Sequence, residues 1–398
     1  MGHIAGIALT TAAMFLVVVA VMLNNPALFY MSTAMIATIG ASRIQAWLSV
    51  RGLRFERTAP EIVSVGELVT IEITVWSDRR IRRPLVTVMD NLPSRIAPTD
   101  LSPSMPIAPA YDIPVRTQYR FRPLRRGVYR WSGLRVAGTD ALGLVTLEKA
   151  YQTPPVEMMV LPVPVPVSVE LPAAAAWGLA ATEGNRGKGH GMEPRGTREY
   201  VPGDPLRHVH WRSSARSGTL LVKEFEAGIQ AVYALLLQRT RGSEIGHGAH
   251  TTLELMCGHS AYLADQLVRA GATVELPGLE TARPSSAEGS RHQEILQALA
   301  GAEADQDRTL GQELQAQLPS ITPGATLLLL VALEEADLPD AVRAASATGA
   351  QVVALVYDAD AFRKRRPGGA SAASGTFVHA LHQAGATVVH MPAEGLRS

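Results

Sequence analysis

The stretch Thr326-Leu327-Leu328-Leu329-Leu330-Val331-Ala332-Leu333 decides the fold of the C-terminal part of this chain. It is a continuous apolar run without a charged residue. Such runs are typical of strands that are buried on both faces, as the strands of parallel sheets are. We therefore expect a fully buried strand here, at the centre of a larger sheet.

Strands and helices alternate on both sides of this run. Strand patterns cover residues 231–238, 273–276, 351–357 and 387–391, and helical patterns cover residues 252–270, 293–300, 310–318, 337–347 and 377–384. This alternation predicts an open, mostly parallel sheet with helices on both faces. We assign residues 227–398 to this α/β domain.

Residues 58–165 have the pattern of a small antiparallel β-sandwich, immunoglobulin-like in general form. Apolar residues alternate with period two from Val63 to Val75, across a turn at Gly66, which predicts a pair of adjacent strands. Further short strands are expected at residues 84–90, 115–121, 127–136, 144–149 and 156–161. A loop carries the arginines at positions 79, 80, 82 and 83, and a second cluster lies at positions 120, 122, 125, 126 and 130. We interpret both as one basic surface, either simply solvated or in contact with anionic lipid.

Residues 1–57 predict a transmembrane helical hairpin. Residues 4–23 carry no charge, and after the turn signal Asn24-Asn25-Pro26 a second apolar run follows, interrupted near its end by Arg43 and Gln45. A cleaved signal peptide fits less well, because the first apolar segment lacks a positively charged N-terminal region and a second apolar segment follows directly after it. Arginines cluster where the second helix ends, whereas the loop is uncharged. The positive-inside rule then predicts a two-pass protein of the cell membrane with cytoplasmic soluble domains.

The segment 198–226 is unusual, and a Pro/Ala/Gly-rich linker at 166–197 precedes it. Its candidate binding residues are Arg198, Glu199, Tyr200, Gly203, Asp204, Arg207, Trp211, Ser214 and Arg216. A turn at Pro202-Gly203, with Asp204 as N-cap, predicts a helix to about residue 217 that Gly218 ends, followed by a strand at 219–225. On that helix Arg207, Trp211 and Ser214 share one stripe.

Three roles for this segment remain open. It is an architectural junction if Tyr200 and Trp211 bury their rings while Arg207 and Arg216 bridge two domains. It is a docking surface for a partner protein if Arg, Tyr and Trp are exposed, since these residues are enriched at binding hot spots. It is an anion or phosphate site if the arginines converge on a ligand.

The segment resembles the signature of the DUF58 family, a domain of unknown function. The shared pattern is R-E-Y, two residues, G-D, two residues, R, three residues, W, two residues, S-A-R; His210 stands where members usually have a small or polar residue. A second resemblance is Arg125-Arg126-Gly127-Val128-Tyr129, followed by Asp140-Ala141-Leu142-Gly143-Leu144. The resemblance implies partnership with a MoxR-type AAA+ ATPase and other membrane proteins of the same system.

It also implies that the α/β domain is von Willebrand factor A-like. Metal-binding domains of that fold place Asp-x-Ser-x-Ser after the first strand, because a hard cation needs carboxylate and hydroxyl oxygens. Here the corresponding segment, residues 238–242, is Gln-Arg-Thr-Arg-Gly. We therefore expect no metal there, and we interpret Glu334, Glu335 and Asp337 as acids at a helix N-terminus.

Other chemistries fit less well. The glycine-rich residues 184–189 lack the first glycine and the Ser/Thr of a phosphate-binding loop. His208 and His210 point apart on a helix and lack a third zinc ligand, and Ser213 and Ser214 lack a nucleophile elbow. Glu199 and Asp204 form a candidate acid pair, although ion pairing with neighbouring arginines is the simpler interpretation.

Composition narrows the class of protein. The 398 residues suffice for two or three domains, the net charge of +1 disfavours a nucleic-acid binder, and the single Cys257 excludes an internal disulfide framework. We expect a membrane-anchored, non-enzymatic adaptor that needs no cofactor and binds no nucleic acid. The alternative is a hydrolase or transferase that acts on an anionic substrate at residues 198–216.

Overall fold

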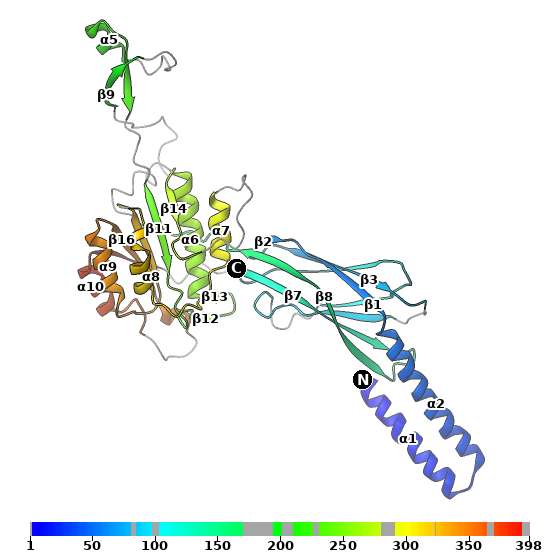
Figure 1. Ribbon diagram of the computed structural model, residues 1–398. Helices are drawn as coiled ribbons and strands as arrows, with labels where there is room; N and C mark the ends of the chain where they lie inside the picture. The colour runs from blue at the N-terminus through cyan, green and yellow to red at the C-terminus, as the bar shows by residue number, and fades with distance from the viewer. Residues whose placement is uncertain are drawn as a thin grey trace.

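In chain order, the protein forms a helix pair, two packed β-sheets, a short β-α unit and a parallel α/β sheet (Figure 1). This architecture comes from a computed structural model. It describes residues 2–80, 85–97, 103–169, 194–200, 210–225, 231–279, 291–322, 324–363 and 370–391.

The parallel sheet of the C-terminal part is confirmed. Its strands are β11 (Val232–Leu237), β14 (Thr273–Glu275), β15 (Thr326–Val331), β16 (Gln351–Tyr357) and β17 (Ala386–Met391). They lie in the order β14-β11-β15-β16-β17, and every pair is parallel. Each residue of β15 is buried, as its unbroken apolar sequence predicts.

Helices cover both faces of this sheet. One face carries α6 (Thr252–Arg269) and α7 (Arg291–Ala300), and the other carries α8 (Leu310–Gln317), α9 (Leu338–Ala347) and α10 (Gly375–Gln383). Side chains of β11 alternate between the two layers: Leu235 packs with α6, and Leu236 packs with α8 and α9. The strands therefore lose contact with water on both sides.

Two β-sheets face each other around one apolar core in the preceding part of the chain. The three-stranded sheet has the order β1-β3-β6, and the five-stranded sheet has the order β2-β8-β7-β4-β5. The strands are β1 (Leu53–Thr58), β2 (Ile62–Ser64), β3 (Val69–Ser77), β4 (Val86–Asp90), β5 (Ser104–Ile107), β6 (Val115–Phe121), β7 (Gly127–Thr139) and β8 (Thr146–Leu161). We call these two sheets the sandwich.

Three expectations for the sandwich need correction. The strands on either side of Gly66 are not paired with each other: β2 pairs with β8, and β3 pairs with β1 and β6. The β2–β8 pair is parallel, so the sandwich is not purely antiparallel. In addition, β1 begins at Leu53, ahead of the expected boundary at residue 58, because Leu53 to Thr58 pair with β3.

A buried ion pair joins the two sheets. Arg57 of β1 donates through Nε and Nη2 to the carboxylate of Asp90 of β4, at 3.0 and 2.6 Å, and both side chains have no exposed surface. Tyr119 of β6 donates its hydroxyl to the same carboxylate at 2.7 Å. Burial, and then the neighbouring Asp90 carboxylate, raise the pKa of Tyr119 well above its ordinary value. The phenol therefore stays protonated as a donor.

The helix pair consists of α1 (Gly2–Met22) and α2 (Pro26–Ser49), and the side chain of Asn25 caps α2 by accepting from the Ala27 N–H. Among the described helices, α2 is long and apolar enough to cross a membrane, and Gly6–Met22, the part of α1 whose side chains the structure describes, is a shorter apolar helix. By length and composition alone this is weak support for membrane anchoring.

The C-terminal end of α2 contacts the β7–β8 hairpin. Asp140, in the turn between these strands, accepts hydrogen bonds from the N–H groups of Leu142 and Val145, and Ala141 N–H donates to Gln45 of α2. Burial raises the pKa of Asp140, but hydrogen bonds from Val145 and Ser42 and from further backbone N–H groups lower it overall. Gly138 leaves room for Ser49 of α2, because a Cβ at position 138 would clash with the Ser49 side chain. The Asp-Ala-Leu-Gly-Leu turn thus joins helix pair and sandwich.

A buried histidine in α6 gives the α/β domain an expected pH dependence. His259 is fully buried, its Nδ1 lies 2.9 Å from the Tyr357 hydroxyl, and burial lowers its pKa from 6.5 to about 4. An unfolded chain binds this proton near pH 6.5, so stability present above that pH is lost as the pH falls toward 4. The full loss is about 3 kcal/mol.

The midpoint of urea unfolding, read from deuterium uptake of α6 peptides between pH 7 and pH 4, measures this effect. The variant His259→Gln should flatten the dependence below pH 6.5, whereas His250→Gln, at an exposed position, should leave it unchanged. An equally steep dependence in His259→Gln would assign the effect to other groups.

Candidate functional site: the signature unit and the interdomain cluster

The segment singled out in the sequence forms a small unit of its own. Strands β9 (Pro194–Glu199) and β10 (Leu221–Phe225) pair antiparallel, and α5 (Trp211–Ser217) lies beside them. Tyr200 N–H donates to Leu220 O, and His210 N–H donates to Leu221 O, each at 2.8 Å. We call β9, β10 and α5 the signature unit. Figure 1 shows it apart from the parallel sheet.

The helix of this unit begins later than expected. His210 has non-helical dihedrals, φ −86° and ψ 79°, and its Nδ1 accepts a hydrogen bond from Ser213 N–H at 3.1 Å. The imidazole therefore serves as the N-cap, a role usually taken by Ser, Thr, Asp or Asn. A helix that runs without a break from Pro205 through His210 is therefore wrong, whereas the expected position of Arg207 lies outside the described residues. Its predicted end is confirmed, because Gly218 adopts the left-handed conformation at φ 72°.

Ser214 joins the helix to the strand. Its buried hydroxyl accepts from Leu221 N–H at 2.8 Å and lies within hydrogen-bond distance of the carbonyl oxygens of His210 and Leu221. This serine of the Ser-Ala-Arg pattern therefore shapes the unit itself. A nucleophilic role is hard to combine with such internal bonding.

Trp211 points outward. Its side chain is 64% exposed, so of the three open roles the junction in which the Trp211 ring is buried does not hold. Arg212 and Arg216 on the same helix are also exposed, Leu220 is 44% exposed, and Tyr200 is half-buried. An exposed tryptophan beside two arginines has the composition of a binding hot spot.

Several predicted residues lie beyond what the structure describes. Gly203, Asp204 and Arg207 are outside the described residues, as are His190, His208 and the glycine-rich residues 184–189. For Arg198 and Glu199 the structure describes the backbone in β9, opposite Val222 and Leu221 of β10. The candidate acid pair of Glu199 and Asp204 is therefore not placed.

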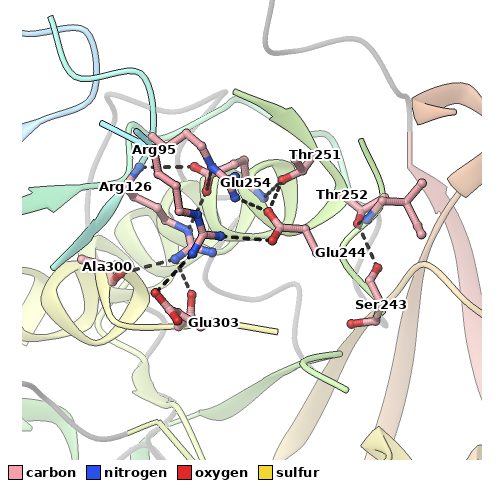
Figure 2. A network of polar contacts seen from close by, with 12 residues as sticks. Arg95, Arg126, Ser243, Glu244, Thr251, Thr252, Glu254, Ala300 and Glu303 are labelled. Carbon is pink, nitrogen blue, oxygen red and sulfur yellow. Dashed lines mark hydrogen bonds and ion pairs between the residues drawn. The ribbon is translucent and has the colours of Figure 1, made fainter. Parts of the chain in front are cut away.

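A second polar site, which sequence reasoning missed, joins the sandwich to the α/β domain (Figure 2). Arg125 is ion-paired with Glu244 and with Glu254, which lies in the first turn of α6. Arg126 donates through Nη1 to the carbonyl oxygens of Leu299, Ala300 and Ala302 at the end of α7. We call Arg125, Arg126, Glu244 and Glu254 the interdomain cluster.

The cluster uses the opposite ends of two helices. The carboxylate of Glu254 lies at the N-terminus of α6, where negative charge is favoured, and the guanidinium of Arg126 lies at the C-terminus of α7, where carbonyl oxygens lack partners. The Arg126 side chain is only 3% exposed. Arg125 and Arg126 are therefore unavailable to the basic lipid-facing surface that we expected, and that part of the expectation is wrong.

The Arg-Arg-Gly-x-Tyr motif now has a physical explanation. Tyr129 lies with its hydroxyl 3.1 and 3.3 Å from the carbonyl oxygens of Arg125 and Arg126, which holds the arginine backbone in place. A Cβ at Gly127 would meet the Tyr129 ring at 3.2 Å, and Gly127 has φ 151°. Burial raises the pKa of Tyr129 to about 12, so its hydroxyl remains a donor at neutral pH. In the sequence, this motif and Glu254 in the first turn of α6 were the two features from which the interdomain cluster could have been predicted.

The edge of the parallel sheet at the ends of β11 and β15 is filled by protein side chains. Gln238 donates to Glu335 at 2.8 Å and accepts from the N–H groups of Ala332 and Leu333, and the Thr240 hydroxyl donates to Glu335 at 2.7 Å. The other oxygen of Glu335 accepts from Leu310 N–H at the start of α8.

The acids after β15 serve different helices. Glu335 is a helix N-terminal acid, as expected, but of α8 rather than of the following α9. Glu334 accepts from the hydroxyl of Ser374, the N-cap of α10, and Asp337 occupies the N-cap position of α9 without a side-chain cap. Among the described residues, no group of three or more His, Cys, Asp or Glu side chains is arranged to hold a metal ion.

Comparisons with known proteins complete this description. Residues 196–361 match the family model described as "Protein of unknown function DUF58". The comparison with curated proteins found no match. Among solved structures, the CARDB domain of the PF1109 protein from Pyrococcus furiosus aligns at 18% identity and TM-score 0.20, over 27% of this chain and 91% of that chain. β-Glucosidase from Listeria innocua aligns at 12% identity and TM-score 0.17, over 27% of this chain and 16% of that chain. At these scores neither likeness informs fold or function.

Proposed function

This chain belongs to the DUF58 family, and from that premise we propose that it is a membrane-anchored, non-enzymatic scaffold that presents its signature unit to a MoxR-type AAA+ ATPase. The choice of partner rests on the family resemblance of the signature. Other membrane proteins of the same system are proposed as further partners.

The exposure of Trp211 carries this proposal. Trp211 is 64% exposed and lies next to exposed Arg212 and Arg216, so the described residues cover only part of this large amphipathic side chain. Such side chains gain most by burial in a partner's pocket. The internal bonding of Ser214 and His210 favours a preformed shape, which lowers the entropic cost of docking.

A firm connection between the helix pair and the α/β domain supports the scaffold role. Strand β8 is 16 residues long, about 50 Å at the usual rise, and runs from the turn that contacts α2 to the side chains that contact α7. Val165 N–H, beyond β8, donates to Gly258 O of α6 at 3.0 Å, and the interdomain cluster adds partly buried ion pairs. These contacts favour a spacer that holds the α/β domain at a set distance from the helix pair.

We propose a cell-membrane location with α1 and α2 crossing the bilayer and the remaining domains in the cytoplasm. The apolar helices and the arginines after α2 support this orientation. Of these arginines, Arg51 lies 4.1 Å from the Trp47 ring, and Arg57 is buried in the sandwich. A reporter fused after residue 398 that is active only outside the cytoplasm should stay silent.

We also propose that the α/β domain is von Willebrand factor A-like and works without a metal. The parallel sheet is consistent with this assignment. At the end of its first strand, Gln238 and Thr240 donate N–H and O–H hydrogen bonds to Glu335, so this carboxylate oxygen is already occupied by protein donors.

Replacing Trp211 by alanine is expected to reduce capture of a co-expressed MoxR-type ATPase by roughly tenfold or more, the effect of losing a hot-spot tryptophan. Crosslinking in native membranes, followed by affinity purification and quantification of the ATPase, measures this. Because Trp211 is exposed, the variant should keep the melting temperature of the unchanged protein.

Tyr111→Ala is the matched control, since Tyr111 is an aromatic residue of the sandwich that is 42% exposed. It should capture the ATPase normally. The proposal fails if Trp211→Ala captures as much ATPase as the unchanged protein, or if the unchanged protein captures none.

A further inference from the structure

A large groove lies where the helix pair meets the β7–β8 turn. Its volume is about 1180 Å³, and its walls come from α1, α2 and residues 144–148. Gly6 lets α1 approach this turn, because a Cβ there would lie 2.7 Å from Leu144 O. Figure 1 shows the N-terminus beside the same end of the sandwich.

The groove carries one cation and one anion among its lining residues, Arg43 of α2 and Glu148 of β8. Both side chains are exposed. They are not ion-paired with each other, and neither forms an ion pair or side-chain hydrogen bond with another residue that the structure describes. Most of the other lining side chains are apolar, among them Ile7, Ile44 and Leu147, and Trp47 and three threonines complete the lining.

We propose that this groove binds one phospholipid whose head group combines a phosphate with a primary amine, as in phosphatidylethanolamine. The inference rests on the membrane anchoring within the proposed function and not on the ATPase partner. The Arg43 guanidinium receives the phosphate, for which its planar donor geometry is suited. The Glu148 carboxylate accepts from the ammonium group, and the apolar walls receive the acyl chains.

The depth of Arg43 in the helix fits this ligand. From Pro26 to Arg43 the helix rises about 26 Å at 1.5 Å per residue, close to the roughly 30 Å hydrocarbon thickness of a bilayer. If the α1–α2 loop lies at one surface, Arg43 reaches the head-group level of the other. Trp47, 41% exposed and one turn further along α2, then lies in the interfacial region that tryptophan prefers.

The two charges explain why an aminophospholipid fits best. An anionic lipid without an amine satisfies Arg43 but brings its negative charge toward Glu148. Phosphatidylcholine supplies a phosphate, yet its quaternary ammonium lacks an N–H group to donate to the carboxylate. Only a head group with both a phosphate and a primary amine satisfies both side chains.

Quenching of Trp47 by brominated lipids tests this in the full chain, reconstituted in phosphatidylcholine vesicles. Each sample contains the same minor fraction of brominated phosphatidylethanolamine, phosphatidylglycerol or phosphatidylcholine. The contribution of Trp47 is the difference between the protein and its Trp47→Phe variant. Phosphatidylethanolamine should quench severalfold more than phosphatidylcholine, with phosphatidylglycerol between them.

Two variants separate the roles of the charges. Arg43→Gln should reduce quenching by all three lipids to one low level. Glu148→Gln should lower the quenching by phosphatidylethanolamine to that by phosphatidylcholine, and it should raise the quenching by phosphatidylglycerol. Arg54→Gln is the control, because Arg54 is exposed, pairs with Asp78 and lies outside the groove. It should behave like the unchanged protein.

The proposal is overturned by equal quenching from the three lipids or by a phosphatidylethanolamine preference that survives Glu148→Gln. Soluble phosphoethanolamine should not relieve the quenching; if it does, the head group alone is the ligand and the lipid assignment is wrong. Absence of quenching by any brominated lipid would refute membrane anchoring itself. None of these results depends on the ATPase.

Discussion

Replacing Arg126 with methionine is expected to uncouple the sandwich from the α/β domain. The change removes the guanidinium that donates to three carbonyl oxygens at the end of α7 and lies 3.9 Å from Glu254. Each buried acceptor left without a donor costs roughly 1–3 kcal/mol, and methionine fills the space without replacing a single bond. We expect a loss of about 3 kcal/mol in local stability at this junction.

Amide hydrogen exchange of peptides covering residues 295–302 and 125–130 measures this loss. A change of about 3 kcal/mol corresponds to exchange that is faster by on the order of a hundredfold in both peptides. Arg130→Met is the control, because Arg130 lies on the same strand, β7, with an exposed side chain. If Arg126→Met exchanges at the rate of the unchanged protein, the junction is held by apolar contacts such as those of Met159 and Ala300 instead.

The same variant bears on the scaffold proposal. If a firm junction holds the α/β domain relative to the helix pair, Arg126→Met should weaken capture of the ATPase less than Trp211→Ala does, since it leaves the signature unit unchanged. The two variants therefore separate the contact surface from the spacer that presents it.

The α/β domain was predictable because its signals are local. A fully apolar strand such as β15, and helices with an apolar face such as α6, are recognisable within a few residues, and parallel pairing follows from their alternation. The strands of the sandwich have equally clear sequence patterns, but these patterns do not indicate which strands pair with each other. β2 and β3 are separated by a short turn, yet Ile62 of β2 pairs with Met159 of β8, far along the chain. Alternation of apolar and polar residues identifies a strand, but it does not determine the strand with which it pairs.

The candidate site was less predictable, for physical reasons. Arginines usually lie at the surface, so Arg125 and Arg126 were assigned to a basic face. Their partners are two glutamates more than a hundred residues away and backbone carbonyl oxygens, which every sequence possesses. His210 was interpreted as a helix residue because Asp204, a common N-cap residue, precedes it after the Pro202-Gly203 turn. The sequence left open whether Trp211 is buried at a junction or exposed for docking, because the residue type alone suits both, and its exposure decides between them.

Arg57→Met is expected to destabilise the sandwich more than any surface change. The variant leaves the Asp90 carboxylate buried with the Tyr119 hydroxyl as its remaining side-chain donor, and breaking a buried pair in this way costs about 3–5 kcal/mol. For a domain of this size the loss corresponds to a melting temperature lower by on the order of 15 °C. Scanning calorimetry of the full chain, or exchange of β3 and β4 peptides on heating, measures it.

The double variant Arg57→Met/Asp90→Asn distinguishes an unpaired charge from a packing defect. Asparagine is neutral and keeps an oxygen that accepts from Tyr119, so the double variant should melt above the single variant although it carries one more change. Arg54→Met, on the same strand but 74% exposed in its ion pair with Asp78, should differ little from the unchanged protein. If the double variant melts below Arg57→Met, the loss comes from the hydrogen bonds of Arg57 to Trp131, Gly133 and Thr153, and the charge of Asp90 is tolerated without its partner.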